Sequence, residues 1–330
     1  QKKQYFTSSS HYEQRDQIIL GTHFIQSEKK RVKLFLKSIK SMGISYIRIP
    51  LLWRQVELHP EQYNWSITDK IISMAVKHNF EVIFNLRAVS PWGSGNRQNN
   101  RQKKGYQKSS YPKNKDAYIQ FLRTFIKRYR GKINFIQIEN EPNAKSFWSG
   151  TFKEYLSLLK LSYQTIKKAN PNMKVISAGL ACGVSSPQMS KSNLSILKAQ
   201  AESILKSKYF DIFDIHNYYP IQTQGTPYTI NFKSYLNIYY QIFKELNIDP
   251  EVWLTEVGVP SETYTFPSRK QYQSSEERQY QDFKSIMSIA ASREIKALFW
   301  IKIFDSKEWM FSHMGLITEQ GNKKKAFRAI

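Results

Sequence analysis

Eight short apolar runs, rich in β-branched and aromatic residues, are spaced along the whole sequence and restrict the fold more than any other feature. They cover residues 18–23, 46–51, 82–86, 133–138, 173–178, 210–216, 252–256 and 297–303. Amphipathic segments, each long enough for three or more helical turns, lie between them at 28–41, 67–78, 116–130, 152–169, 233–246 and 276–291. Alternating strands and helices imply a parallel sheet, and eight such units in 330 residues match a closed barrel better than an open, doubly wound sheet. We therefore predict an α/β fold, a single (β/α)8 TIM barrel.

The chain shows no sign of a second domain. No stretch rich in Ser, Gly or Pro divides it, so we expect one barrel over residues 17–330, preceded by a polar arm at 1–16. The longest irregular stretch, 92–115, follows the third apolar run and would lie at the rim where the strands end. Its charged residues are all basic: Arg97, Arg101, Lys103, Lys104, Lys108, Lys113 and Lys115. This stretch is either one wall of a cleft at that rim or a solvated, flexible loop.

Two of the predicted strands end in a carboxylate. The fourth run leads to Asn140 and Glu141, directly before Pro142, and the seventh ends with Glu256. The carboxyl ends of all barrel strands meet at one rim, so these two carboxylates are expected to face each other. Hydrolysis of a glycosidic bond with retention uses such a pair, with nearest oxygens about 5–5.5 Å apart. One such Glu would more readily be a solvated strand end, but two of them favour catalysis.

The sequence around these residues resembles clan A of the glycoside hydrolases, and within it most closely family 39. Residues 140–143 (NEPN) are similar to the clan's motif at the end of strand four, whose Glu is the acid/base. Residues 253–258 (WLTEVG) are similar to the strand-seven segment, whose Glu is the nucleophile. Further similar stretches extend over almost the whole chain, at 21–24, 47–50, 63–65, 213–218 and 299–300. The resemblance implies a retaining glycosidase with Glu141 as acid/base and Glu256 as nucleophile.

Several polar residues near the strand ends are candidates for supporting roles. Arg48 ends the second strand and is expected to keep Glu256 ionised, unless it forms only a surface salt bridge. Asn140 is placed to bind a sugar 2-hydroxyl. The resemblance implies that Tyr218 donates its hydroxyl to Glu256, although a core tyrosine is the alternative. His216 either lines the same wall or is a structural histidine.

Aromatic residues supply candidates for contact with a sugar ring. Trp300, in the eighth run, is expected to offer an apolar face on which the ring stacks. Trp92 and Trp148 either extend that platform or take part in ordinary packing. His23, in the stretch that resembles the end of strand one, is also counted among the substrate-binding candidates.

Glu139 departs from the family pattern, because relatives often carry Trp at this position. Alternation along a strand places it on the opposite face from Asn140. We therefore expect Glu139 to face the surrounding helices and to pair with a basic residue there.

The charge balance indicates a polyanionic partner but does not select one. The 50 Lys and Arg residues exceed the 26 Asp and Glu residues by 24, which attracts nucleic acid, anionic polysaccharide, lipopolysaccharide or a phospholipid surface, or simply keeps the protein soluble. No recognised nucleic-acid-binding module accompanies this charge, so nucleic acid is not expected as a partner. No apolar run has the roughly 18 residues of a membrane span.

Other chemistries lack their motifs. The six histidines include no His-Glu-x-x-His pair, and the sequence contains neither a phosphate-binding Gly-rich loop nor a Gly-x-Ser-x-Gly elbow. The single cysteine, Cys182, has no identifiable base and is expected to be a buried or rim thiol. We expect no metal and no cofactor.

The family resemblance also suggests a substrate and a location. It favours an exported or surface polysaccharide, cut internally, and hence a secreted, periplasmic or cell-surface protein. A first residue of Gln1 instead of Met agrees with loss of an upstream segment. The rival prediction is a non-catalytic barrel that binds glycans or other polyanions, and the presence of both carboxylates with their supporting residues argues against it.

Overall fold

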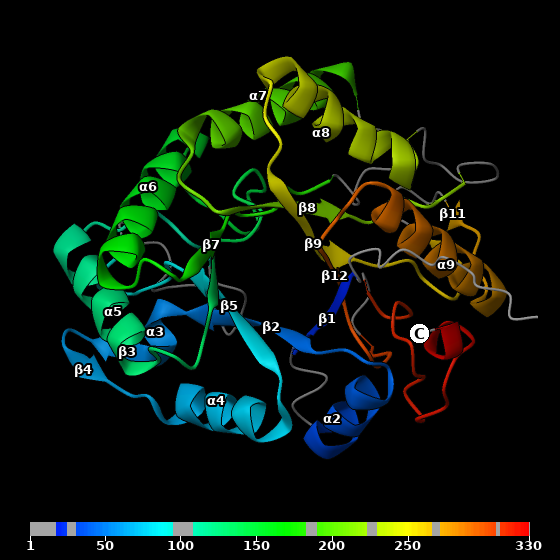
Figure 1. Ribbon diagram of the computed structural model, residues 1–330, viewed down its shortest axis with the longest axis horizontal. Helices are drawn as coiled ribbons and strands as arrows, with labels where there is room; N and C mark the ends of the chain where they lie inside the picture. Colours follow the sequence, from blue (N-terminus) through cyan, green and yellow to red (C-terminus); the bar gives the residue numbers. More distant parts are fainter. Residues whose placement is uncertain are drawn as a thin grey trace, which may run out of the picture.

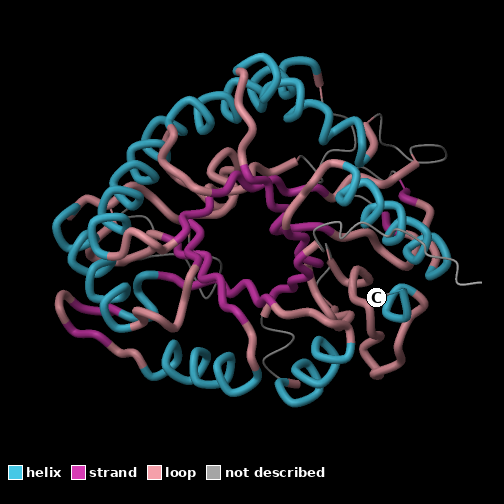
Figure 2. The backbone as a smooth tube through the Cα atoms, in the orientation of Figure 1, coloured by secondary structure: helices cyan, strands magenta, loops and turns pink. Residues whose placement is uncertain are grey.

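Eight parallel strands close into a barrel, as the sequence predicted, in the spatial order β1-β12-β9-β8-β7-β6-β5-β2 (Figures 1 and 2). Each of the eight apolar runs overlaps one of these strands. They are β1 (Ile19–His23), β2 (Tyr46–Leu52), β5 (Glu81–Arg87), β6 (Phe135–Ile138), β7 (Lys174–Ile176), β8 (Ile212–Asn217), β9 (Glu251–Val257) and β12 (Ala297–Trp300). The single (β/α)8 barrel is therefore confirmed.

The structure is a computed structural model that describes residues 18–24, 31–94, 108–182, 190–222, 230–265, 271–307 and 311–329. The polar arm predicted at 1–16 lies outside these residues. So does the part of the basic stretch that carries Arg97, Arg101, Lys103 and Lys104. Lys113 and Lys115 lie within the described residues and are exposed.

Long helices surround the barrel and cover the outer faces of its strands (Figure 1). Those in the described residues are α2 (Val32–Ser41), α4 (Ser66–His78), α5 (Lys115–Arg128), α6 (Phe152–Ala169), α7 (Lys191–Ser207), α8 (Phe232–Leu246) and α9 (Glu276–Ser292). Several begin at a side chain that accepts a backbone N–H. Thr151 and Glu154 of α6, for example, form a reciprocal capping box, with hydrogen bonds of 3.2 and 2.6 Å. No helix in the described part of the chain is both long and apolar enough to span a bilayer.

Some elements were not expected from the sequence pattern. Helix α7 was not singled out, although its buried residues, Leu197, Ala201, Ile204 and Leu205, have the spacing of one helix face. The chain also forms a short helix α3 (Trp53–Val56), a hairpin of β3 (Glu57–His59) and β4 (Gln62–Tyr63), a second hairpin of β10 (Tyr264–Thr265) and β11 (Gln271–Tyr272), and a 3₁₀ helix η2 (Ala326–Ala329). The hairpins and α3 lie in connections, where the two-residue period of a barrel strand gives no guidance.

An apolar plug fills the barrel interior toward the amino ends of its strands. Trp253 stacks on Phe299 at 5.9 Å between ring centres, and Tyr46 and Phe135 pack against Trp253. The smaller members of this inner cluster are Ile19, Ile83, Ile176, Ile212 and Ala297. Because the plug leaves no pore, any site for chemistry must lie above it, toward the carboxyl ends of the strands.

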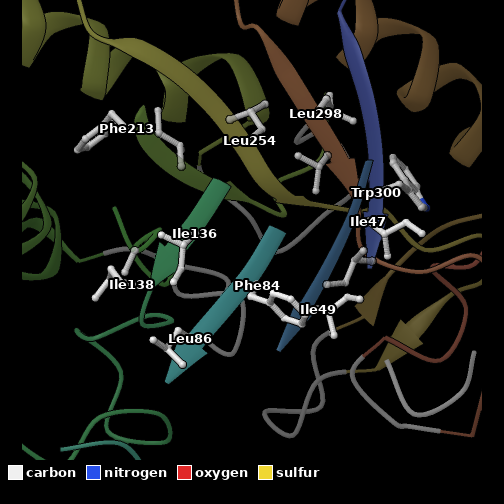
Figure 3. Packing of buried hydrophobic residues seen from close by; sticks show 14 of the residues in the cluster. Ile47, Ile49, Phe84, Leu86, Ile136, Ile138, Phe213, Leu254, Leu298 and Trp300 are labelled. Atoms are coloured by element: carbon white, nitrogen blue, oxygen red, sulfur yellow. The ribbon is translucent and has the colours of Figure 1, made fainter. Parts of the chain in front are cut away.

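A second, larger core lies between the strands and the helices. Alternate strand residues supply it, including Ile47 and Ile49 of β2, Ile136 and Ile138 of β6, and Leu298 and Trp300 of β12 (Figure 3). Trp300 therefore lies in this outer core, where it packs against Phe283 of α9. The period of two along each strand thus decides which side chains can reach the barrel mouth.

Candidate active site

A layer of buried polar side chains lies directly above the apolar plug. Five strands each carry a buried polar residue two positions after an apolar residue of the plug. These polar residues are Arg48, Asn85, Gln137, Asp214 and Thr255. The Gln137 amide joins all five of these strands. Its Oε1 accepts from Arg48 Nε (2.6 Å) and Asn85 Nδ2 (3.4 Å), and its Nε2 donates to Asp214 (2.6 Å) and to Thr255 Oγ1 (3.4 Å). This layer holds the residues above it in fixed positions.

Arg48 is the central cation of the site. Its guanidinium donates to Glu256 Oε1 (2.9 Å), Asn140 Oδ1 (2.8 Å) and Gln137 Oε1 (2.6 Å). Only 3% of its side chain is exposed, so the alternative of a surface salt bridge does not describe it. By accepting from Arg48, the Asn140 amide is turned so that its NH₂ group remains available to a ligand.

A bulge in β9 turns Glu256 into the barrel. The pairing of β8 with β9 shifts by one residue between Asp214 and His216, so that Thr255 and Glu256 both point toward the interior although they are consecutive. Glu256 Oε2 accepts the hydroxyl of Tyr218 at 2.7 Å. The contact expected between Tyr218 and Glu256 is thus present in the structure.

The surroundings of Glu256 favour its ionised form. Burial alone would raise the pKa of this carboxyl group. The positive charges of His216 and Arg48 and the hydrogen bond from Tyr218 outweigh burial and lower the pKa of Glu256 to about 2. At neutral pH Glu256 is therefore a carboxylate, the form in which it could act as a nucleophile.

Glu141 reaches the same space because the strand ends early. Strand β6 stops at Ile138, and the two glutamates beyond it take left-handed backbone conformations, with φ of 68° at Glu139 and 44° at Glu141. Such conformations are strained for residues other than glycine and often lie at functional sites. The turn is held by the Glu141 N–H, which donates to Gly179 O at 3.2 Å.

The environment of Glu141 favours the protonated form. Burial raises the pKa of Glu141 above its ordinary value, and the charge of Glu256 adds to the rise. The charge of His216 and its hydrogen bond to Glu141 Oε1, at 3.0 Å, offset part of this effect. The two glutamates therefore differ in the way required of an acid and a nucleophile.

His216 lies beneath both glutamates and is fully buried. Its Nδ1 is 3.0 Å from Glu141 Oε1 and 3.4 Å from Glu256 Oε2, and its Nε2 is 3.1 Å from Asp214 Oδ2. Burial alone would lower the pKa of His216, but the charges of Glu256 and Asp214 raise it to about 10. His216 thus does not line an exposed wall of the site. It is also more than a structural histidine of the core, because it contacts both carboxyl groups.

His23 differs from His216 in charge. Its Nε2 donates to Thr255 O at 2.7 Å, and its Nδ1 lies 3.5 Å from Arg48 Nη1. Burial and the charge of Arg48 lower the pKa of His23 to about 4. His23 is therefore neutral at physiological pH, and its position supports Arg48.

The aromatic platform expected from the sequence is not found at Trp300 or Trp148. Trp300 is 2% exposed, donates its indole N–H to Met314 O and faces the helices, so the prediction of a stacking face there is wrong. Trp148 is equally buried, with its N–H on Thr151 O, and thus takes the packing alternative. Trp92 is half-buried, with its edge against Trp53.

Sequence reasoning missed other residues of this region. Gln137, Asp214 and Thr255 were not singled out, although each lies two positions from a residue that faces the barrel interior. Phe311 was also missed. Its ring lies half-buried at 5.3 Å from that of Tyr218, which bonds Glu256. The alternation of side chains along each strand could have identified Gln137, Asp214 and Thr255. Phe311 lies in a loop, where no such pattern exists.

Glu139 is buried beside the site but does not face it. Its Oε1 accepts the N–H of Ala88 at 2.6 Å, and its Oε2 lies 3.9 Å from Arg87 Nε. Burial raises its pKa. The expected pairing with a basic residue is therefore present, but the reason is the left-handed turn at Glu139 and not strand alternation.

The atoms of Glu141, His216 and Glu256 lie close enough to raise the question of a metal ion. One atom from each lies within 4.8 Å of the others. His216 Nδ1 already bonds Glu141 Oε1 at 3.0 Å and lies 3.4 Å from Glu256 Oε2, and the Arg48 guanidinium lies 2.9 Å from Glu256. We therefore interpret the group as an acid–base pair bridged by a histidine and do not assign it as a set of metal ligands.

The coupling of the two glutamates predicts an effect on titration. Changing Glu256 to Gln removes a negative charge from beside Glu141, so the pKa of Glu141 should fall. Carbon-13 NMR of the carboxyl groups measures this directly. Glu277→Gln, which alters an exposed carboxylate paired with Lys325, should leave the pKa of Glu141 unchanged. Equal behaviour of the two variants would show that Glu141 and Glu256 are not coupled.

The sequence matches a family model described as cellulase, glycosyl hydrolase family 5, over residues 10–303. No curated protein matches the chain.

Several solved structures share the fold. A family 39 glycoside hydrolase from Bacteroides cellulosilyticus is 18% identical, with a TM-score of 0.66 over 94% of this chain and 61% of that one. A family 39 β-xylosidase from Caulobacter crescentus is 15% identical, with a TM-score of 0.66 over 96% and 70% of the two chains. A family 10 endo-β-1,4-xylanase from Gloeophyllum trabeum is 12% identical, with a TM-score of 0.66 over 96% and 95%. At these identities the likeness shows only the fold. The matching structures include family 39 enzymes, the family that the sequence resembles.

Proposed function

The chain belongs to the cellulase family of glycosyl hydrolases, family 5, in clan A, and from this premise we propose that it hydrolyses a polysaccharide with retention of configuration. The observation that carries the proposal is the pair of buried carboxyl groups, Glu141 and Glu256, at one barrel mouth. Their facing oxygens lie within 4.8 Å. Retaining enzymes have a separation of about 5–5.5 Å, whereas inverting ones need roughly 6.5–9.5 Å to hold a water between the carboxyls. The short spacing and the opposite pKa shifts support retention.

In the first step Glu256 attacks the anomeric carbon of the sugar. A bond forms between a Glu256 oxygen and that carbon while the bond to the leaving oxygen breaks. Glu141 transfers its proton to the leaving oxygen, which departs as a hydroxyl group. The result is a covalent glycosyl-enzyme on Glu256 and a Glu141 carboxylate.

In the second step a water molecule takes the place of the leaving group. The Glu141 carboxylate accepts a proton from this water, whose oxygen attacks the anomeric carbon from the side that the leaving group occupied. The bond to Glu256 breaks, and both glutamates return to their starting states. Two displacements at one carbon give a product of the original configuration.

The neighbours of the pair have roles that follow from their contacts. Arg48 and Tyr218 bond both oxygens of Glu256, so they hold it in place and stabilise it when it leaves in the second step. The Asn140 NH₂ group is available to the sugar 2-hydroxyl, an interaction that strengthens in the transition state. Phe311, beside Tyr218, offers the apolar contact for a sugar ring that Trp300 does not.

We further assign the substrate to an extracellular or surface polysaccharide that is cut internally, and the protein to a secreted, periplasmic or cell-surface location. The net charge of +24 supports an anionic glycan over a neutral one. The chain spans 61% of the family 39 structure from Bacteroides cellulosilyticus, so the activity of that whole protein is not carried over.

The anomeric configuration of the first product tests the proposed function. Proton NMR should show, in the minutes after enzyme is added to a panel of neutral and acidic polysaccharides, a product with the configuration of the bond that was cut. Glu262→Gln, an exposed carboxylate in the loop after β9, is the matched control and should behave like the wild type. A product of the opposite configuration would exclude retention. Binding to the panel without turnover would favour a non-catalytic barrel.

A further inference from the structure

Asp214 is a buried carboxylate that has no route to a substrate. It lies on β8 two residues before His216, and its side chain is fully buried. Its Oδ2 accepts from Gln137 Nε2 (2.6 Å) and Thr255 Oγ1 (2.6 Å) and lies 3.1 Å from His216 Nε2, while its Oδ1 accepts the Thr255 N–H (2.8 Å). Every polar contact of Asp214 is with a donor, as an ionised carboxylate requires.

The position of His216 between acceptors fixes its protonation. Its Nε2 faces the Asp214 carboxylate, so this nitrogen carries a proton. Its Nδ1 faces Glu141 Oε1 at 3.0 Å and Glu256 Oε2 at 3.4 Å. A proton on Nδ1 as well makes the ring an imidazolium that donates to a carboxyl oxygen on each side.

We propose that Asp214 is a positioning residue that keeps His216 doubly protonated and thereby directs the acid proton of Glu141 to Oε2, the oxygen that His216 does not bond. This inference rests on the proposed function, in which Glu141 donates that proton. If Nδ1 carried no proton, Glu141 would donate to it, and its proton would point away from the leaving group. Asp214 prevents this through its bond to the opposite nitrogen.

The backbone near Gly179 shields Asp214 and His216 from water. Gly179, after β7, packs so closely that a Cβ atom there would overlap the His216 ring and lie 2.7 Å from Asp214 Oδ2. The Gly179 carbonyl also accepts the N–H of Glu141. One segment of backbone thus covers the Asp214–His216 pair and holds the acid in place, and the exclusion of water strengthens the charge interaction.

The charged groups around His216 come from several strands. Glu141 follows β6, Glu256 lies on β9 and Asp214 on β8 itself. Arg48 of β2 bonds the Glu256 oxygen that His216 does not face, and His23 of β1 contacts Arg48. Of these three carboxyl groups, Asp214 contacts Nε2 of His216, whereas the catalytic pair faces Nδ1.

Nitrogen-15 NMR of the wild-type protein tests the protonation state without relying on activity. Both ring nitrogens of His216 should remain protonated at pH 8. A neutral ring at pH 7 would overturn the proposal whether or not the protein is a retaining hydrolase. In Asp214→Asn the ring should become neutral at a pH lower by at least one unit.

The pH dependence of hydrolysis tests the consequence for catalysis. Loss of the imidazolium should raise the pKa of Glu256, so the acid limb of kcat/KM should move to higher pH in Asp214→Asn, with a loss of about tenfold or more in kcat and little change in KM. Asp211→Asn alters a neighbouring carboxylate paired with Lys167 and should move neither limb. Thr255→Val removes one donor from Asp214 but keeps its charge, so His216 should stay doubly protonated. If His216 lost its second proton at the same pH in Asp214→Asn as in the wild type, or if all three variants shared one shift, the role of Asp214 would be overturned.

Discussion

Replacement of Glu256 by Ala should lower kcat on a polysaccharide about 10⁴-fold or more, the scale on which loss of a covalent nucleophile acts in other hydrolases. The Arg48 guanidinium and the Tyr218 hydroxyl, which bond the two oxygens of Glu256, would remain in place around the vacated volume. They form a site for a small anion. Added azide should therefore bind there and attack the anomeric carbon from the same side as Glu256.

The product distinguishes a missing nucleophile from a damaged fold. A single displacement by azide gives a glycosyl azide of inverted configuration, which mass spectrometry and NMR identify. The matched control is Glu262→Ala, because Glu262 lies in the loop after the same strand but is exposed. It should keep wild-type turnover and form no azide adduct. A glycosyl azide of retained configuration, or substantial turnover without azide, would contradict the assignment of Glu256.

The regular part of this molecule follows from its sequence pattern. Strands β2 and β9 are buried at most positions on both faces, and their sequences are mainly apolar, as in strands of a parallel barrel. Glu141 lies beyond the end of β6 and Glu256 near the end of β9, and both reach the same rim because all strands point the same way. Asn140 and Tyr218 follow the ends of β6 and β8, as expected, and they meet Arg48 and Glu256 there. Arg48 does not end β2 as expected but lies within it, two residues beyond Tyr46 of the plug, and its long side chain reaches Glu256 from there.

The irregular part does not follow from strand period. Strict alternation cannot place Thr255 and Glu256 on one side, and only the shifted register of β9 allows it. The same alternation was applied to Glu139 beyond the end of β6, where left-handed residues had already replaced the strand. Both departures from regular geometry lie at the carboxyl groups proposed for catalysis.

The prediction for Trp300 was wrong because the alternation of side chains was not applied to β12. Phe299 belongs to the inner plug, so its neighbour Trp300 must face the helices. The expectation of a stacking face came from the apolar face of the indole ring and not from the strand period. Asp214 and Gln137 could have been found by extending that period, because Ile212 and Phe135 lie two residues before them in the inner cluster.

Replacement of Glu141 by Gln should have effects that depend on the leaving group. Hydrolysis of a polysaccharide, whose leaving oxygen must be protonated, should slow by about 10²- to 10⁴-fold, the usual contribution of a general acid. An aryl glycoside with a good leaving group needs no such proton, so its first step should slow much less. Its second step lacks the general base, so the glycosyl-enzyme should accumulate and the released phenol should appear as a burst.

The basic limb of the pH profile identifies which carboxyl group supplies the proton. Burial raises the pKa of Glu141, and the first step requires its protonated form, so wild-type activity should fall as pH rises through that pKa. Gln cannot titrate, so this fall should be absent from Glu141→Gln. Glu139 is a demanding control because burial also raises its pKa, yet it bonds the Ala88 N–H and not the site. If the fall in activity at high pH persists in Glu141→Gln and vanishes in Glu139→Gln, the acid is Glu139. The left-handed turn would then present Glu139, and not Glu141, to the substrate.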